Sequence, residues 1–128
     1  MSFLLDTHAF LWFLAGDPRL SERALEVIEN QSHAKYVSAT SCWEIAIKHS
    51  RGRLELGHPL EVLFHEGIEG NGFVFLNIDR KHVLSLPPFR EDRRDPFDRL
   101  LAAQCSAEGL VLVSGDEMLD NYAIERIW

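Results

Sequence analysis

The sequence predicts an α/β fold, a three-layer α/β/α sandwich built on a mainly parallel central sheet of four or five short strands. Three observations lead to this prediction. Short apolar runs of strand length alternate along the chain with longer stretches of helical periodicity. Prolines, glycines and acid–proline pairs separate these stretches. Regular strand–helix alternation favours parallel strands, with helices on both faces of the sheet.

The first half of the chain supplies two strands and three helices. Phe3–Leu5 is an apolar run that predicts a strand, and a helix should follow from about Thr7 to Ala15. Ser21 is placed to cap a second, amphipathic helix. Tyr36–Ser38 predicts the second strand, which leads into a helix over Thr40–Ser50.

The middle of the chain continues the alternation. Pro59 opens a helix with an apolar face, and the glycines from Gly70 onward end it. Phe73–Ile78 predicts the third strand, followed by a short helix around Arg80–Leu86. The pair of prolines that begins at Pro87 indicates a loop.

The strongest helix signal follows that loop. Asp95 is placed to cap a helix whose first residue is Pro96. Gly109 stands at the C′ position, directly after the last helical residue, Glu108. The remaining predicted elements are a fourth strand at Leu110–Val113, a short helix near Glu117–Asn121 and a possible edge strand ending at Trp128.

Composition predicts one soluble domain over residues 1–128. Of the 128 residues, 46% are hydrophobic and 26% are charged, and no repeat or long linker divides them. The longest apolar stretch is far too short to span a bilayer, and the first residues do not resemble a signal peptide. Cys42 and Cys105 belong to no C-x-x-C pair, so we expect reduced core thiols, although a bridge between them stays open. We therefore expect a cytoplasmic protein without a membrane span.

The net charge of −7, from 20 acids against 13 basic residues, argues by itself against nucleic-acid binding. Two features weaken that objection. A metal ion would neutralise several of the acids, and the basic residues are clustered. The two clusters are Lys48, Arg51 and Arg53, and Arg90, Arg93, Arg94 and Arg99.

Four acids fall near the edge where parallel sheets bind ligands, outside the carboxyl ends of the strands. Asp6 directly follows the first strand, and Asp116 lies just past the fourth. Glu44 lies one turn into the helix that follows the second strand. Asp98 lies in the first turn of the helix that precedes the fourth strand. We expect the four carboxyl groups to meet in one pocket.

Each acid also has a purely structural explanation. Asp6 and Asp116 could cap helices by accepting hydrogen bonds from free backbone amides. Asp98 suits the positive end of its helix dipole. Glu44 could pair with Lys48 on a solvated helix face. For each acid taken singly, these alternatives stay open.

Glu44 and Asp98 are the harder two to explain structurally. Glu44 is the only charge in the segment Cys42–Ile47, so most of that helix should be buried. Asp98 shares a helical face with apolar residues at i+3, i+4 and i+7. Burying an ionised carboxylate is costly unless it is paired or binds a metal, and neighbouring acids raise one another's pKa. A divalent cation would keep all four ionised.

The ligand type predicts which cation. The pocket would offer only oxygen donors, which favours Mg²⁺ or Mn²⁺ over zinc. The six histidines show no metal-binding spacing. His8 is expected to pack near the pocket or line its rim rather than bind the metal.

These acids stand in motifs that resemble the PIN-domain family, specifically the VapC-like toxin ribonucleases of type II toxin–antitoxin pairs. The similar segments span nearly the whole chain in the order of the family, and the third is the most specific. They are LLDTH at Leu4–His8, SCWEI at Ser41–Ile45, DPFDRLLAAQ at Asp95–Gln104 and LVSGD at Leu112–Asp116.

The resemblance implies a single PIN-like nuclease domain with magnesium- or manganese-dependent endoribonuclease activity. It implies an RNA substrate, a cognate antitoxin whose tail blocks the pocket, and a homodimer. The implied catalytic and metal-binding acids are Asp6, Glu44, Asp98 and Asp116.

The departures from the family pattern are modest. His8 replaces the asparagine that is common after the D-T pair, and Ser114-Gly115 stands where a threonine and a variable residue are usual. Neither change removes an acid. Ser114 and Thr7 are expected to support the metal-binding carboxylates.

In the implied mechanism, one or two metal ions lower the pKa of a bound water, which attacks the RNA phosphodiester without a side-chain nucleophile. Arg99 is expected to hydrogen-bond one of the acids or to face a substrate phosphate. Other residues expected to contact RNA are Lys48, Arg51, Arg90, Arg93 and Arg94.

Two other functions stay open. Asp6 could be the nucleophile of an aspartyl-phosphate phosphotransferase, but His8 stands where such enzymes need a second aspartate. Alternatively, the chain could be a non-catalytic RNA- or protein-binding module whose acids only cap helices. Such a module would gain no stability from magnesium or manganese.

Overall fold

The centre of the molecule is a five-stranded sheet in the order β3-β2-β1-β4-β5, in which every neighbouring pair is parallel. This computed structural model describes residues 1–87 and 95–128. The α/β prediction, with its parallel sheet, is confirmed. The strands are β1 (Ser2–Leu5), β2 (Ala34–Ser38), β3 (Val74–Leu76), β4 (Val111–Val113) and β5 (Arg126–Ile127).

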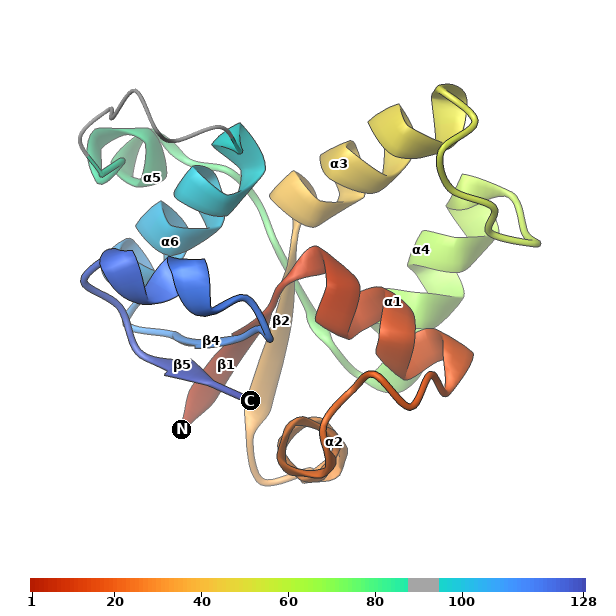
Figure 1. The fold of residues 1–128 in the computed structure, drawn as a ribbon, viewed down its shortest axis with the longest axis horizontal. Coiled ribbons are helices and arrows are strands. Elements are labelled where there is room, and N and C mark those ends of the chain that lie inside the picture. Colours follow the sequence, from red (N-terminus) through yellow and green to blue (C-terminus); the bar gives the residue numbers. More distant parts are fainter. Residues whose placement is uncertain (88–94) are drawn as a thin grey trace.

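Helices cover both faces of the sheet (Figure 1). On one side lie α1, α2 and α4; on the other lies α6, with α5 beside it, and α3 leads away from the upper end of β2. The helices are α1 (Thr7–Ala15), α2 (Glu22–Glu29), α3 (Ala39–Ser50), α4 (Leu60–Ile68), α5 (Arg80–Leu84) and α6 (Pro96–Glu108), with 3₁₀ turns η1 (Glu69–Asn71) and η2 (Glu117–Asn121).

Two hydrophobic layers result, because successive residues of a strand point to opposite faces. Phe3 and Leu5 belong to the layer under α1, α2 and α4. Leu4 belongs to the layer under α6, where it packs with Leu101 and Leu112. The central strand β1 is therefore apolar at both faces, as expected of a covered parallel sheet.

The predicted caps of α6 and α2 are confirmed, whereas the helix predicted around Arg80–Leu86 ends at Leu84. The Asp95 carboxylate accepts hydrogen bonds from the backbone N–H of Phe97 and Asp98, and Pro96 is the first residue of α6. Gly109 ends that helix in the left-handed conformation, with φ of 68°. Ser21 caps α2 through the N–H of Ala24.

The bounds of the second and third strands differ from the prediction. The third strand is Val74–Leu76 rather than Phe73–Ile78, because it pairs only with β2, whose ladder ends at Ser38 opposite Leu76. The second strand begins earlier than predicted, at Ala34, because Ala34 pairs with Ser2 of the central strand.

Both cysteines are free thiols, so the possible bridge does not form. Burial raises the pKa of Cys42 to about 11 and that of Cys105 to about 12, which leaves both unreactive at neutral pH. In the described part of the chain, no helix combines the length and apolar character that crossing a bilayer requires.

Candidate acidic metal site

Asp6 ends β1 and begins α1. Its carboxylate caps the helix by accepting a 2.8 Å hydrogen bond from the N–H of Ala9, as the structural explanation expected. Its exposed fraction is only 7%, and burial raises its pKa. The Ser114 hydroxyl hydrogen-bonds to the carboxylate, and this contact acts to lower the pKa of Asp6. Capping alone does not require such burial of a charge.

Glu44 lies on α3 and is 4% exposed, so its helix face is not solvated. Its Oε1 accepts a hydrogen bond of 2.6 Å from the Thr7 hydroxyl, which lies 3.0 Å from the Ser41 hydroxyl. Its Oε2 accepts one of 2.6 Å from Nζ of Lys48. The predicted pair with Lys48 therefore forms, but around a buried carboxylate.

Asp98, in the first turn of α6, lies partly buried among other acids. Its pKa is raised to about 7, first by burial and then by repulsion from Asp95, Asp6, Glu44 and Asp116. Three of those four neighbours are the other predicted acids. The structure thus brings the four predicted acids within electrostatic reach of one another.

Asp116 is the most exposed member of the set. Its carboxylate accepts a 3.0 Å hydrogen bond from the N–H of Met118 and so caps the turn η2. Its own N–H donates to the Ser114 hydroxyl at 3.1 Å. Ser114 therefore contacts both Asp6 and Asp116, and it holds the ends of β1 and β4 in register at the acids.

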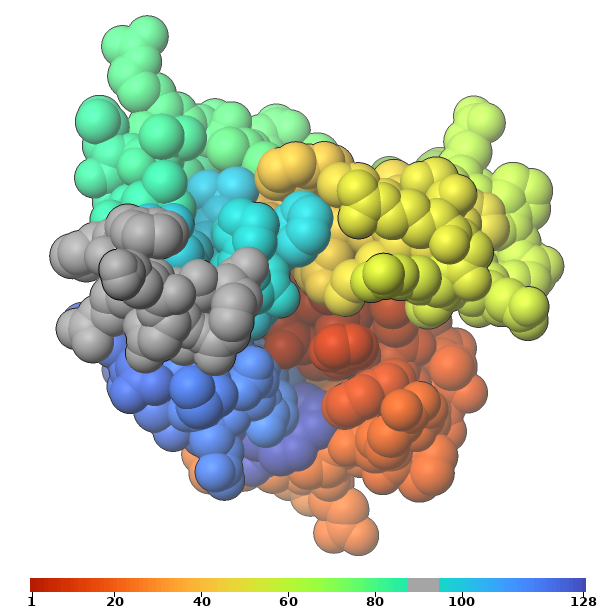
Figure 2. Space-filling model, turned by 45° about the horizontal axis from the view of Figure 1, so that its top comes forward, coloured from red at the N-terminus to blue at the C-terminus, as the bar shows by residue number. Residues whose placement is uncertain are grey.

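The four acids come from the carboxyl edge of the sheet and the start of α6. In Figure 2 the N-terminal segment, in red, is visible in a hollow between α3 in yellow, α6 in cyan and the C-terminal residues in blue. The donors are all carboxylate oxygens, and Asp98 resists ionisation first because of its burial and then because of its acidic neighbours. This donor set fits a hard divalent cation, which would relieve that repulsion.

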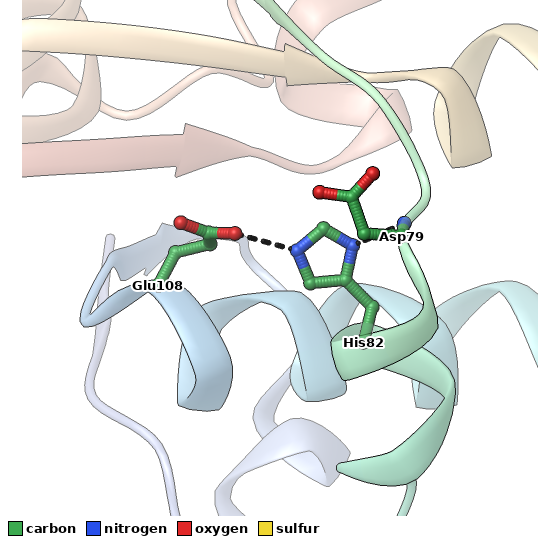
Figure 3. A group of neighbouring side chains, drawn as sticks. All are labelled: Asp79, His82 and Glu108. Atoms are coloured by element: carbon green, nitrogen blue, oxygen red, sulfur yellow. Dashed lines mark hydrogen bonds and ion pairs between the residues drawn. The ribbon is translucent and has the colours of Figure 1, made fainter.

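A different group of side chains is packed more tightly. Among residues 1–87 and 95–128, three ligand atoms lie within 4.8 Å of one another only at Asp79, His82 and Glu108 (Figure 3). This is the one place in that part of the chain where side chains already stand close enough to share a cation. The four predicted acids lie farther apart.

Hydrogen bonds explain the group in Figure 3 without a metal. The buried His82 ring accepts at Nδ1 from the N–H of Asp79, at 2.9 Å. Its Nε2 therefore carries the proton, which it donates to Glu108 at 2.7 Å. Lys81 adds an ion pair of 2.9 Å to the same carboxylate. These contacts join α5 to the end of α6. The sequence signal was Asp79 three residues before His82, a spacing typical of a capping box.

Gln104 is a buried residue that the sequence reasoning missed. Its Oε1 accepts hydrogen bonds from the hydroxyls of Ser38, at 2.5 Å, and Thr40, at 3.2 Å. Its Nε2 donates to the Asn77 carbonyl at 3.2 Å. Gln104 thereby fixes α6 against the start of α3, the two helices that carry Asp98 and Glu44. Its position among apolar residues of α6 was the available signal.

The basic residues predicted to contact RNA have mixed positions. Lys48 is engaged with Glu44, and Arg51 is exposed at the end of α3. Arg99 donates from Nη2 to the Pro87 carbonyl at 2.8 Å. This contact tests neither the predicted hydrogen bond to one of the acids nor the predicted contact with a substrate phosphate. Arg90, Arg93 and Arg94 lie outside the described residues.

The family model described as "PIN domain" matches residues 3–125. No curated protein matched the sequence.

Several solved structures share the fold. VapBC2 from Rickettsia felis, bound to a promoter DNA fragment, has a TM-score of 0.69 at 14% identity, covering 99% of this chain and 98% of its own. FitAcB from Neisseria gonorrhoeae gives 0.62 at 18% identity, covering 100% and 97%. VapBC-1 from nontypeable Haemophilus influenzae gives 0.61 at 12% identity, covering 99% and 97%.

Proposed function

The chain belongs to the PIN domain family, and from this premise we propose that it is a divalent-metal-dependent endoribonuclease, the toxin of a type II toxin–antitoxin pair. The observation that supports this best is the electrostatic state of Asp98. Its pKa of about 7 reflects burial beside three other acids, an arrangement that costs stability unless a cation shares it.

In this proposal Asp6, Glu44, Asp98 and Asp116 hold Mg²⁺ or Mn²⁺. The bound cation would supply Lewis acidity and a water of lowered pKa for attack on a phosphodiester. Thr7 and Ser114 orient the carboxylates of Glu44 and Asp6 through their hydroxyl groups. No side-chain nucleophile is required.

The partners are proposed from the structural relatives. Those relatives are VapBC2, FitAcB and VapBC-1, the first of them bound to a promoter DNA fragment. We infer by analogy that this chain pairs with an antitoxin, which keeps the nuclease inactive, and that it forms a homodimer.

The test is cleavage of single-stranded RNA with magnesium by wild type, by two variants at the acids and by one control variant. Asp98→Asn and Asp6→Asn should lower the rate roughly a hundredfold or more, and a chelator should abolish it. Asp79→Asn, in the group of Figure 3, should leave the rate unchanged. Full activity in both Asp98→Asn and Asp6→Asn would refute the metal mechanism at these acids.

A second candidate function is a non-catalytic RNA- or protein-binding module. The observation that favours it is that Asp6 and Asp116 cap helical turns. Asparagine keeps the oxygen that caps, whereas alanine removes it. Asp6→Ala should therefore cost about 1 kcal/mol of stability in chelator, and Asp6→Asn should cost little. If wild type and Asp6→Asn respond identically to manganese in melting experiments, the module is the better description.

A further inference from the structure

A row of aromatic rings lies next to two of the four acids, Asp6 and Asp116. Trp128 packs against Gly115, next to Asp116: a Cβ at Gly115 would stand only 2.9 Å from Cε2 of the indole. The centroids of the Trp128 and Trp12 rings are 5.9 Å apart. Trp12 in turn stacks on His8, at 5.3 Å and 22° between planes. His8 lies close enough to lower the pKa of Asp6. The row therefore connects the ends of β4 and β1.

A fixed cation extends this row. Cζ of Arg19 lies 4.8 Å from the centroid of the Trp12 ring. Asp17 holds the guanidinium with hydrogen bonds of 3.1 Å to Nε and 2.7 Å to Nη2. The Arg19 side chain is nonetheless 68% exposed, and His8 is exposed as well. The exposed planes of the row are therefore the His8 ring and the Arg19 guanidinium, both held against Trp12 before any ligand binds.

The row opens on a cavity of about 500 Å³. Its walls come from α1 and from the segment that leads into α4, including Leu54, Leu56 and His58. The volume lies within the usual range for small-ligand sites. Its lining is partly apolar, and its charged residues are Asp17, Arg19 and Glu55.

We propose that the part of this row formed by His8, Trp12 and Arg19 is a stacking site for an unpaired nucleobase of single-stranded RNA, next to the phosphate that the acids process. This rests on the proposed function and specifies its substrate. Ring and guanidinium planes bind bases through stacking and cation–π contacts, whatever the base sequence. A base inside a duplex cannot offer its face, so the site selects unpaired RNA.

The overall charge supports stacking as the source of affinity. With a net charge of −7, the chain gains little long-range attraction for phosphates. Base stacking does not depend on net charge and is screened little by salt. The row therefore supplies an attraction that the charge balance of the chain does not.

The experiment measures binding of a short single-stranded RNA that carries one 2-aminopurine, a base whose fluorescence is quenched by stacking. The protein is the Asp98→Asn variant, which should bind without cleaving. In that background His8→Ala and Trp12→Leu should each weaken binding about tenfold, or about 1.4 kcal/mol, and should reduce the quenching. His8→Ala removes an exposed ring, so it keeps the test valid if Trp12→Leu unfolds.

Phe13→Leu is the matched control. Phe13 lies on the same helix as Trp12, but its ring packs on Phe73 at 5.6 Å, outside the row. The Phe13→Leu variant should leave RNA binding and the quenching of 2-aminopurine unchanged. An RNA with abasic sites in place of its bases should bind equally weakly to the protein with an unchanged row and to its His8→Ala variant, because no base remains to stack.

The outcomes separate this inference from the proposed function. If wild type cleaves RNA but the row variants bind and quench as the parent does, the stacking site is wrong and the nuclease stands. That result would leave the row available to a protein partner. If duplex RNA binds as tightly as single-stranded RNA, the inference is also overturned. If the chain neither binds nor cleaves RNA, both proposals fail.

Discussion

Glu44 accepts hydrogen bonds on both carboxylate oxygens, from Thr7 on one side and Lys48 on the other. The hydroxyl is a neutral donor, whereas the ammonium compensates the buried charge. A cation at the four acids would compensate the same charge. Lys48 would therefore compete with such a cation for Glu44, and the affinity of the proposed site would depend on that competition.

Replacing Lys48 with methionine should strengthen metal binding. Without the ammonium, Glu44 is a buried charge with no basic partner, and manganese gains the compensation that Lys48 supplied. We expect roughly tenfold tighter manganese binding, or about 1.4 kcal/mol more stabilisation at high manganese, read from melting temperatures. Lys81→Met is the control, because Lys81 pairs with Glu108 instead. Equal manganese shifts in wild type and Lys48→Met would contradict the competition.

The raised pKa of Asp98 predicts how the free energy of unfolding depends on pH in the absence of metal. Its pKa rises from 3.8 in the unfolded chain to about 7 in the folded one. Between these values the folded state holds a proton that the unfolded state releases, so the free energy of unfolding falls as pH rises from about 4 to about 7. The raised pKa of Asp6 acts in the same direction.

Urea unfolding in chelator, near pH 5 and near pH 8, measures this effect. Asparagine cannot ionise, so Asp98→Asn should lose less stability between the two pH values than wild type does. Manganese should stabilise wild type more at the higher pH, because the metal binds ionised carboxylates. A wild type that gains stability relative to Asp98→Asn as pH rises would contradict the assignment.

At the level of elements, α3 and α6 are joined by buried polar contacts rather than by apolar packing alone. Gln104 of α6 accepts from Ser38, which caps α3, and from Thr40 in its first turn. Buried polar networks of this kind fix one relative position of the elements that they join. The separation of Glu44 from Asp98 therefore depends on a residue that touches neither acid.

Gln104→Leu should lower the free energy of unfolding by roughly 1–3 kcal/mol, because it leaves buried hydroxyl and carbonyl groups unpaired. It should also weaken the manganese-induced rise in melting temperature. The chain offers a matched control in Gln31→Leu, at an exposed position, which should change stability by less than about 0.5 kcal/mol. If both variants behave alike, the network does not stabilise the helix pair.

For the whole molecule, β1 is the central strand and contributes to both core layers. Leu4 and Leu5 are each fully buried, on opposite faces of the sheet. The chain therefore depends on its first few residues for the stability of both layers. Asp6, the next residue, gains its fixed position from the same strand.

Leu4→Ala and Leu5→Ala should each cost about 2–5 kcal/mol in urea unfolding, because each leaves a cavity in its own layer. Leu84→Ala should be nearly neutral, since Leu84 is 79% exposed. A large loss at Leu5 with none at Leu4 would mean that the layer under α6 is not a packed core.

Much of the fold followed from local sequence signals. Apolar runs located the strands, and the capping residues Ser21, Asp95 and Gly109 located helix ends, because these signals act within a few residues. The length of β3 could not be predicted, because it is set by the end of its partner strand. The positions of the four acids relative to the strands also followed from the sequence.

By itself, then, the sequence determined the elements, their parallel arrangement and the edge of the sheet where the acids gather. Only the tertiary structure decided how each acid is held. Thr7 meets Glu44 across 37 residues of chain, and Ser38 meets Gln104 across 66. Burial, charge repulsion and ring stacking depend on such distant pairs, whereas periodicity and capping depend on neighbours. The raised pKa of Asp98 and the aromatic row beside the acids therefore emerge only when the chain is folded.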